Sequence, residues 1–486
     1  MSHQARRYLG FALLSLSVLI AGGMYWRFTR QELWGFAPLF MYLAAYGGIL
    51  LLRTFRRDGS YRADNAYSVA SGFLLGVGFP GLLPFPFLLL VAWVPLLLLY
   101  QRLRARGAGY GEVFRHALAA TLLFNILTTY WVTNTAFAAG LFALVANSLL
   151  MTLPWLFFHW TSQRSPKVAI LALVAGWIAF EYGHYHWELN WPWLTLGNGF
   201  AQFPSLIQWY EITGVLGGSA WIWGTNYLAL RVYQGRKWWP LTLAVLLPLF
   251  GSLLRYFTYA APEGKTITVA TIQPNFEPHF EKFANNQNAQ IDTFLRLSLA
   301  ATEAGPVDYV VYPETSFGRI EENQPLNNAP MRILGAELRD RTGYLVTGFD
   351  GYYRFADDEP VSKAVRYIPR GDGSTVALEA LNAVVQVDLQ SQETQTYRKG
   401  VFVPGAESFP FRRVFFFLEE WVNSLGGTVA GRGTQERRLP LTSPQAKVAP
   451  VICYESVFGE YFTDYVREGA QAVFVMTNDG WWSNTA

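Results

Sequence analysis

The sequence predicts a polytopic α-helical membrane domain followed by an extracytoplasmic α/β domain. Long apolar runs separated by short polar loops fill the chain up to residue 258, and short strand-like runs between polar stretches follow from residue 266. Hydrophobic residues make up 51% of the chain and aromatic residues 16%, more than a soluble globular protein of 486 residues needs. We therefore expect a membrane domain at 1–258, a linker at 259–265 and a second domain at 266–486.

Apolar runs in the first half are close to the length of about 20 residues that crosses a hydrocarbon core. The nine runs are 8–25, 34–52, 66–80, 84–101, 117–137, 139–160, 168–187, 207–231 and 239–258. The short run 66–80 is expected to form a tight hairpin with 84–101, because "FPGLLPFPF" between them supplies prolines and a glycine. The first run has the basic flank of a signal peptide, but no convincing cleavage site follows it, so we expect it to be a helix.

Basic residues predict the orientation of this helical bundle. They gather before the first run and after the second, fourth, sixth and eighth runs: Arg6, Arg7, Arg53, Arg56, Arg57, Arg62, Arg102, Arg104, Arg106, Arg115, Arg164, Lys167, Arg231, Arg236 and Lys237. The alternate loops before the ninth run hold only Arg27 and Arg30. Because loops rich in lysine and arginine stay in the cytoplasm, the N-terminus is expected inside and the second domain outside.

The charge and the cysteine content exclude some classes of function. A net charge of +3 is too small to imply a nucleic-acid partner. Cys453 is the only cysteine, so neither an intrachain disulfide nor a multi-cysteine metal cage can form. A lone cysteine is most often a small buried hydrophobic residue, and any function of Cys453 must come from the reactivity of its thiol.

The second half alternates strand-like runs with amphipathic stretches. The expected strands are 266–275, 307–314, 344–350, 382–389, 448–455 and 471–479, and the expected helices are 287–303 and 329–342. Near-continuous apolar strands between helices predict an α/β domain whose sheets are covered by helices. We find neither an internal repeat nor a phosphate-binding glycine loop.

Three of the strand-like segments lead into residues that could together perform nucleophilic catalysis: Glu314 ends "VVYPE", Lys399 follows "TYR", and Cys453 ends "PVIC". A thiol becomes a good nucleophile only after a base removes its proton. A carboxyl group in apolar surroundings has a raised pKa, which we expect of Glu314, and could take that proton at neutral pH. A lysine can stabilise an oxyanion. Each residue alone is better explained without catalysis: Glu314 as a surface acid, Lys399 as a solvated lysine and Cys453 as a core thiol.

The order and combination of these motifs resemble the Glu-Lys-Cys triad of the nitrilase superfamily. With the membrane half attached, the chain resembles the apolipoprotein N-acyltransferase family. "YPET" is similar to the family's Trp-Pro-Glu segment, "LNAVV" carries Asn382 at a family position, and "YRKGVFVPGAESFP" has the family's spacing from Lys399 to Glu407. "ICYE" and "TNDGWWS" are similar to the nucleophile strand and the strand after it, and the former contains Tyr454 and Glu455.

This resemblance covers about residues 66–486 and implies an αββα nitrilase-like sandwich for the second domain. The first two apolar runs are then N-terminal additions, which keep the second domain outside. The family continues beyond "NDGWWSNTA" to a last transmembrane helix, so the C-terminal part of the catalytic domain and that helix are expected to be missing from this chain.

By resemblance, the reaction is a ping-pong acyl transfer through a thioester on Cys453. Glu314 would deprotonate the thiol, and Lys399 would hold the oxyanion. The acyl donor would be a membrane phospholipid of the phosphatidylethanolamine type, and the acceptor the N-terminal diacylglyceryl-cysteine of a lipoprotein. No metal or diffusible cofactor is implied. The implied location is the bacterial inner membrane, with the catalytic domain in the periplasm.

Further residues have supporting roles by the same resemblance. Glu407 and Glu455 would orient the lysine and its loop, and Asn382 and Tyr454 are family positions that this chain retains.

An aromatic stretch at 412–427, "RRVFFFLEEWVNSLGG", contains Phe416 and Trp421. It fits an amphipathic helix packed on its own domain as well as a loop that dips into the outer leaflet and guards the acyl entrance.

Two other functions remain open. A membrane-tethered nitrilase-type amidase or hydrolase would use the same triad with water as the second nucleophile. A transporter or sensor would use its outer domain only for binding. Against the latter, the expected helices hold few charges of the kind that transport pathways need, and Glu181, Glu211 and Arg255 are expected near helix ends or interfaces.

Overall fold

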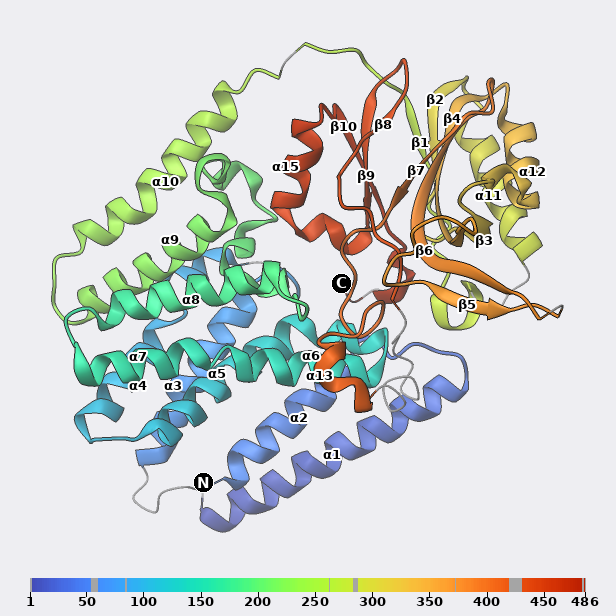
Figure 1. The fold of residues 1–486 in the computed structure, drawn as a ribbon. Helices are drawn as coiled ribbons and strands as arrows, with labels where there is room; N and C mark the ends of the chain where they lie inside the picture. Colours follow the sequence, from blue (N-terminus) through green and yellow to red (C-terminus); the bar gives the residue numbers. More distant parts are fainter. Residues whose placement is uncertain are drawn as a thin grey trace. The chain divides into compact units, whose positions relative to one another are not determined.

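The computed structural model describes residues 2–53, 60–83, 85–261, 263–282, 287–371, 373–418, 431–482 and 485. The chain divides into two compact units (Figure 1). The first unit is Met1–Ala261 with Trp482–Ala486, and the second is Pro262–Trp481. The break between Ala261 and Pro262 falls inside the segment 259–265 that the sequence analysis reads as a linker.

Helices make up the first unit in the part of the chain that the structure describes. They are α1 (His3–Thr29), α2 (Ala37–Leu52), α3 (Ser60–Gly78), α4 (Val94–Ala105), α5 (Tyr110–Thr129), α6 (Phe137–Leu150), α7 (Leu153–Arg164), α8 (Ala169–His186), α9 (Tyr210–Tyr233) and α10 (Trp239–Thr258). By length and hydropathy, four described helical stretches could cross a membrane: His3–Thr29, Pro86–Ala105, Phe137–Arg164 and Trp239–Thr258. Ala37–Leu52 is a shorter apolar helix. The number of crossings stays a prediction.

Prolines explain why some predicted apolar runs are broken. The run 84–101 divides into a 3₁₀ helix, Pro86–Leu90, and α4, which has Pro95 in its first turn. The run 139–160 divides into α6 and α7, and Pro154 occupies the first turn of α7. Proline lacks a backbone N–H and therefore starts a helix more easily than it continues one.

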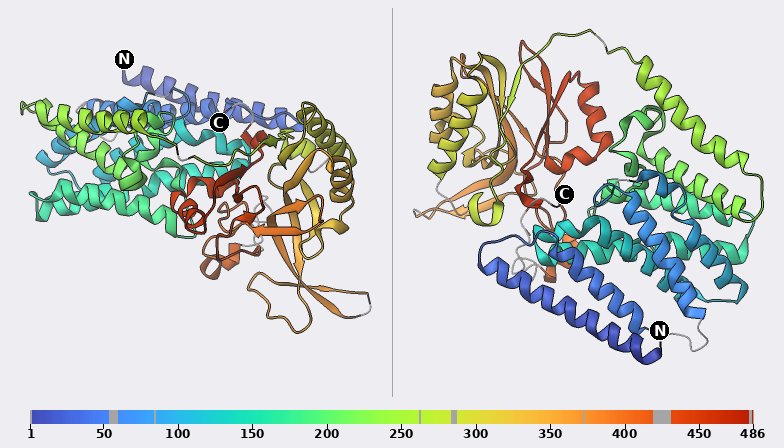
Figure 2. Two further views of the ribbon diagram at one scale, coloured as in Figure 1. Left: turned by 90° about the horizontal axis from the view of Figure 1, so that it is seen from above. Right: turned by 180° about the vertical axis from the view of Figure 1, so that it is seen from behind.

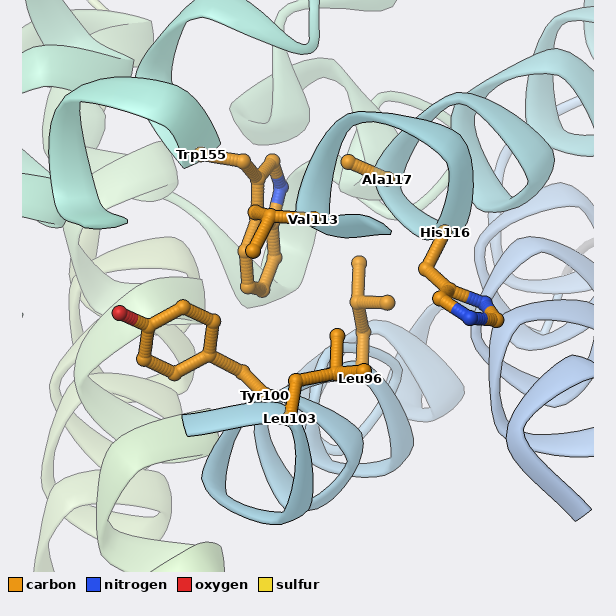
Figure 3. Close-up of a pocket in the computed structure, with 7 residues that line it drawn as sticks. All are labelled: Leu96, Tyr100, Leu103, Val113, His116, Ala117 and Trp155. Carbon is orange, nitrogen blue, oxygen red and sulfur yellow. The ribbon is translucent and has the colours of Figure 1, made fainter. Parts of the chain in front are cut away.

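Four tryptophans form the centre of the first unit: Trp93, Trp155, Trp177 and Trp223 are fully buried. The rings of Trp93 and Trp223 are stacked with centroids 5.0 Å apart, and the centroids of Trp93 and Trp177 are 4.9 Å apart. A small cavity lies beside Trp155 and is shown in Figure 3. It is lined by Leu96, Tyr100, Leu103, Val113, His116, Ala117 and Trp155.

The charged residues of the helices are in different environments. Glu181 lies near the end of α8 but is buried, and it accepts hydrogen bonds from Trp177 Nε1 at 2.7 Å and the Leu196 backbone N–H at 2.8 Å. Arg255 and Glu211 are exposed and form an ion pair at 2.9 Å. The bonds to Glu181 hold the segment after α8 against that helix.

The second unit contains two sheets covered by helices. The larger sheet has seven strands, in the order β1-β2-β4-β6-β5, with β3 paired to β4 and β7 paired to β6. These strands are β1 (Val269–Thr271), β2 (Val307–Val311), β3 (Phe317–Glu321), β4 (Thr342–Arg354), β5 (Arg366–Pro369), β6 (Thr375–Asp388) and β7 (Thr394–Arg398). The smaller sheet, in the order β10-β9-β8, consists of β8 (Leu441–Thr442), β9 (Lys447–Ile452) and β10 (Ala472–Met476).

The layers of this unit run helix, sheet, sheet, helix (Figures 1 and 2). Helices α11 (Gln287–Ala301) and α12 (Ala329–Leu338) cover the outer face of the larger sheet, where Phe294 and Leu334 belong to the same buried core as Val310. Helix α15 (Gly459–Arg467) covers the smaller sheet. The two sheets meet where Tyr309 and Phe474 place their ring centroids 5.4 Å apart. The predicted αββα sandwich is confirmed.

Several elements of the second unit were not expected from the sequence. Strands β3, β5, β7 and β8 and helix α15 are short, and most of them carry polar residues that give no continuous apolar signal. Strand β6 begins at Thr375, ahead of the expected 382, because its first half forms a hairpin with β5 whose residues are partly exposed.

Candidate active site

Strand ends bring the sequence-predicted residues Glu314, Lys399 and Cys453 into the second unit's candidate site. Glu314 lies three residues after β2, Lys399 follows β7 directly, and Cys453 follows β9 directly. Strand β7 pairs with β6, and the backbone N–H of Lys399 extends that ladder by donating to the Asn382 carbonyl at 2.9 Å. This pairing places the side chains of Asn382 and Lys399 next to each other on neighbouring strands.

The ammonium of Lys399 lies between two carboxylates. Its Nζ donates to Glu314 Oε1 at 2.9 Å and to Glu407 Oε1 and Oε2 at 3.0 and 2.9 Å. The Lys399 side chain is only 1% exposed. A buried lysine needs such partners, since an unpaired buried charge costs several kcal/mol. The lysine is therefore fixed in one place and one charge state.

Asn382 joins the same two carboxylates from the β6 side. Its Nδ2 donates to Glu314 Oε1 at 2.8 Å and to Glu407 Oε1 at 2.9 Å. Glu407 also accepts from the Val403 backbone N–H at 3.0 Å, which anchors it to the loop after Lys399. Four of the sequence-predicted residues thus form one hydrogen-bonded group.

Opposing effects set the pKa of Glu314. Burial raises the pKa of its carboxyl group, but the Lys399 ammonium, together with the hydrogen bonds from Lys399 and Asn382, outweighs burial and holds that pKa below its ordinary value. The expectation of a raised pKa for Glu314 is wrong, because a cation faces this carboxylate. Burial lowers the pKa of Lys399, but Glu314 and Glu407 hold it well above the ordinary value. At neutral pH the pair is a carboxylate and an ammonium.

Cys453 begins a sharp turn at the end of β9. Its backbone φ is 47°, in the left-handed region that non-glycine residues avoid, and a short 3₁₀ helix (Cys453–Val457) follows. Burial raises the pKa of the Cys453 thiol to about 12; the charge of Glu314 adds to this, while Lys399 and a hydrogen bond with Thr477 oppose it. The thiol is therefore protonated at neutral pH and needs a base to become a nucleophile.

Glu455 lies two residues beyond the thiol and is completely buried. Its Oε2 accepts from the Ile452 backbone N–H at 2.8 Å, and its Oε1 accepts from the Gly400 backbone N–H at 2.6 Å. The carboxylate therefore connects the turn of Cys453 with the turn that follows Lys399. Burial raises the pKa of Glu455 above its ordinary value.

Tyr454 is the remaining member of the "CYE" sequence. It is buried and its ring packs edge-on against Phe458, with centroids 5.3 Å apart. The supporting role expected of Tyr454 stays a prediction.

A second lysine beside Glu314 was missed in the sequence analysis. Lys282 Nζ donates to the Glu314 backbone carbonyl at 3.1 Å and to Thr315 Oγ1 at 2.5 Å. Burial lowers the pKa of Lys282, whereas the charges of Glu314, Cys453 and Asp350 raise it. The sequence held no usable signal, because Lys282 lies in a charged stretch outside any strand-like run.

Of Phe416 and Trp421, the two residues expected to guard the acyl entrance, the structure describes only Phe416. Phe416 follows the short helix α13 (Arg412–Phe415) and its side chain is 65% exposed; Phe417 is 67% exposed. Packing of these two phenylalanines into the core of their own unit is therefore excluded. Trp421 lies outside the described residues.

The group combines a protonated thiol, an ionised carboxylate within electrostatic reach of it, and a fixed ammonium. Such a set can deprotonate the thiol, add it to a carbonyl carbon and stabilise the resulting oxyanion. Among the residues that the structure describes, no group of three or more histidine, cysteine, aspartate or glutamate side chains could hold a metal ion.

Comparison with protein families identifies both halves of the chain. A family model described as the apolipoprotein N-acyltransferase N-terminal domain matches residues 71–228, and a carbon-nitrogen hydrolase model matches residues 268–485. The apolipoprotein N-acyltransferase of Chlorobaculum tepidum is 26% identical over 429 residues, which cover 85% of this chain and 78% of the relative. That of Geobacter metallireducens is 26% identical over 434 residues, covering 85% of this chain and 77% of the relative.

Solved structures share a weaker likeness. An amidase from Nesterenkonia sp. AN1 has 17% identity and a TM-score of 0.26, covering 44% of this chain and 67% of that chain. A carbon-nitrogen hydrolase from Helicobacter pylori G27 has 11% identity and a TM-score of 0.26, covering 43% and 59%. The assignment of the second unit to the nitrilase-like αββα fold rests on the carbon-nitrogen hydrolase family model and on the sheet topology of the unit itself.

Proposed function

Because the chain belongs to the apolipoprotein N-acyltransferase family, we propose that it transfers an acyl chain from a membrane phospholipid to lipoproteins. The acceptor is the α-amino group of an N-terminal diacylglyceryl-cysteine. The observation that carries the proposal is the Lys399 ammonium held 2.9 Å from Glu314, with the only thiol of the chain in electrostatic contact with both. Both substrates are anchored in lipid, which explains why a hydrolase-type domain is joined to apolar helices.

The first half-reaction forms a thioester. The Glu314 carboxylate takes the proton of the Cys453 thiol, and the thiolate attacks the ester carbonyl of the phospholipid, forming a C–S bond. Lys399 stabilises the oxyanion of the tetrahedral intermediate. The C–O bond then breaks, and the departing lysophospholipid oxygen takes the proton from Glu314. Because the thiol pKa is raised to about 12, this proton transfer is needed before attack.

The second half-reaction consumes the thioester. The neutral amine of the diacylglyceryl-cysteine attacks the thioester carbonyl, forming a C–N bond, while Glu314 takes a proton from the amine. Lys399 again faces the oxyanion. The C–S bond breaks, and the Cys453 thiolate takes the proton back from Glu314. Two easier steps replace one difficult aminolysis, and the free enzyme is restored.

Supporting residues keep the lysine in position for both steps. Glu407 and Asn382 complete the shell around Lys399 and Glu314 with bonds of 2.8–3.0 Å. The lysine is held by carboxylates on both sides, so it retains its proton while the oxyanion forms and collapses.

The proposed location is the bacterial inner membrane, with the second unit in the periplasm. The asymmetry of basic residues along the first half supports this orientation. The exposed side chains of Phe416 and Phe417, next to Arg412 and Arg413, support a lipid-facing entrance in the segment that begins there, with Trp421 as a further member. A phospholipid of the phosphatidylethanolamine type is the proposed donor.

Substitution of the three central residues tests this function. Cys453→Ala should abolish thioester formation and transfer, and Glu314→Gln and Lys399→Ala should each lower transfer by at least about 100-fold. Glu303→Gln and Lys265→Ala, at exposed positions, are the matched controls and should keep full activity. The assay follows acyl transfer from phosphatidylethanolamine vesicles to a diacylglyceryl-cysteinyl peptide. If Cys453→Ala keeps near-normal transfer, the thiol takes no part in the reaction and contributes only to core packing.

A membrane-tethered amidase or hydrolase is the second candidate, favoured by the match of residues 268–485 to a carbon-nitrogen hydrolase family. It would use the same three residues, but water would attack the thioester in place of the amine. The same assay separates the two: transfer yields an N-acylated peptide, whereas hydrolysis yields free fatty acid or, from an amide, ammonia.

A further inference from the structure

The carboxylate of Glu455 accepts four hydrogen bonds in a site that excludes solvent. Besides the backbone N–H groups of Ile452 and Gly400, its Oε1 accepts from Tyr461 OH at 2.6 Å and from Tyr397 OH at 3.0 Å. The hydroxyl groups of the two tyrosines also contact each other. All four donors are neutral, so the position of this buried carboxyl group depends on how completely they surround it.

These donors come from three elements, two of which lead into the proposed catalytic residues Lys399 and Cys453. Tyr397 belongs to β7 and lies two residues before Lys399, and Gly400 follows that lysine. Ile452 is the last residue of β9, directly before Cys453. Tyr461 comes from α15 and donates to Oε1, the same oxygen that accepts from Tyr397 and Gly400. A single carboxylate thus joins the β7 turn, the β9 turn and a helix.

Close packing allows this arrangement only with glycine at position 400. A Cβ atom there would lie 2.4 Å from Tyr461 OH, so a side chain would push the phenol away from Glu455. The ring of Tyr461 is in turn covered by the Arg438 guanidinium, 4.2 Å from the ring centroid. The phenol is therefore fixed from two sides.

The turn at Cys453 needs such support. A non-glycine residue with φ of 47° is strained and persists only where the surroundings impose it. The Ile452 N–H bond to Glu455 fixes the residue immediately before the strained one. Displacing the thiol by about 1 Å from the lysine can cost a large part of a catalytic rate.

We propose that Tyr461 and Tyr397 are positioning residues that act through Glu455 to set the Cys453 thiol against the Lys399 ammonium. The two phenols hold the carboxylate in the position where it accepts hydrogen bonds from the Gly400 and Ile452 backbone N–H groups. It thereby connects the turn after β7 with the turn after β9. The inference rests on the proposed acyl transfer and adds two residues to it, one of them on α15, a helix that lies outside the predicted motifs.

Tyr461→Phe tests the proposal with Tyr344→Phe as the matched control. Tyr344 lies on β4, is also buried, and donates its hydroxyl to the Asp388 carboxylate at 3.3 Å rather than to Glu455. Both variants lose one buried hydroxyl that donates to a carboxylate. Tyr461→Phe should lower kcat at least tenfold with KM for the peptide acceptor within twofold, and Tyr344→Phe should keep kcat within twofold.

Alkylation of the single thiol supplies an independent readout. Because Cys453 is the only cysteine, the rate of its reaction with iodoacetamide reports this site alone. In Tyr461→Phe the rate at pH 7 should fall by about tenfold, since the thiol is no longer held against its base, while thermal unfolding should match that of Tyr344→Phe. The double variant Tyr461→Phe with Tyr397→Phe should lose less than the product of the single losses, because both phenols serve one carboxylate.

Two results would overturn the proposal: kcat of Tyr461→Phe within twofold of the unmodified protein, or an equal loss in Tyr344→Phe. Measuring Cys453→Ala in the same assay separates this failure from that of the proposed function. If Cys453→Ala retains transfer, the acyl-transfer chemistry is wrong; if it abolishes transfer while Tyr461→Phe has no effect, only the positioning role is wrong.

Discussion

At the scale of single residues, the charge around Glu314 determines what this carboxylate can do. Lys399 and Lys282 both lie close to it, and the pKa of Glu314 is held below its ordinary value although burial alone would raise it. As a base, Glu314 must be ionised before it accepts the thiol proton. Activity should therefore be lost on acidification through the pKa of Glu314, which lies below the ordinary range of a glutamate.

Replacing Lys282 tests this electrostatic account. Lys282→Met removes one of the positive charges that lower the pKa of Glu314, so that pKa should rise and the acid limb of the kcat/KM profile should move to higher pH. Lys265→Met, which removes an exposed lysine from the same unit, should leave the limb in place. An acid limb that stays unchanged in Lys282→Met would mean that Glu314 is not the group that titrates.

The residues of the site differ in how well the sequence predicted them. Glu314 and Cys453 each follow an apolar strand, so the strand pattern pointed to them, Lys399 follows the short segment "TYR", and resemblance added Glu407, Asn382 and Glu455. Lys282, Tyr397 and Tyr461 lie in segments whose polar pattern gives no such signal. Their contacts arise from tertiary packing, which pairs a loop and a helix with strands far away in the sequence.

At the scale of elements, the close approach of β4 to the loop of Glu314 fixes where the base sits. The Gly348 N–H donates to the Pro313 carbonyl at 3.2 Å, and the Gly348 carbonyl accepts from the Ser316 N–H at 2.9 Å. A Cβ atom at position 348 would lie 2.7 Å from Glu314 Cα. Only glycine allows the strand and the loop to come this close.

Gly348→Ala should therefore displace Glu314 and lower transfer activity by at least about tenfold. Gly343→Ala is the matched control on the same strand, since a Cβ atom there would meet its nearest neighbour, the Asp308 carbonyl oxygen, at 3.4 Å. The comparison uses kcat/KM together with thermal unfolding. If both variants lose activity equally, the close approach at Gly348 has no special importance for the base.

The exposed phenylalanines after α13 are expected to serve the lipid substrate. Phe416→Ser with Phe417→Ser should leave the second unit folded, because both side chains are more than 60% exposed, but should lower turnover on phosphatidylethanolamine vesicles. Reaction with a short, water-soluble acyl ester should survive. Tyr367→Ser with Ile368→Ser, a pair of exposed apolar residues on β5, is the control.

Equal losses on vesicles and on the soluble ester, with unchanged thermal unfolding, would contradict the lipid-entrance role. Such a result would assign the two phenylalanines to the reaction itself.

Element prediction succeeded where the apolar signal was long and failed where elements were short. Every apolar run expected in the first half contains helix, although prolines divide two of the runs. In the second half, β7 was missed because "TQTYR" alternates polar residues with a single buried tyrosine. Helix α15 was missed because only nine residues form it, and two tyrosines make its buried face.

At the scale of the whole molecule, the distribution of charge and apolar residues separates the two units. The predicted orientation rests on the basic loops of the first half and can be tested by labelling. In a Cys453→Ala background, the exposed Asn327→Cys should react with a membrane-impermeant thiol reagent added to spheroplasts, and Lys167→Cys should react only after the membrane is broken. The reverse pattern would invert the topology and remove the periplasmic assignment.

The central claim is that Cys453 carries the acyl chain, and mass spectrometry of the protein purified from its membranes tests it most directly. An acyl mass is expected on the peptide containing Cys453. It should be released by neutral hydroxylamine, as expected of a thioester, removed by incubation with a diacylglyceryl-cysteinyl peptide, and absent from Glu314→Gln. An active preparation whose acyl mass sits on another residue, or whose Cys453 stays unmodified when phospholipid is supplied without acceptor, would contradict it.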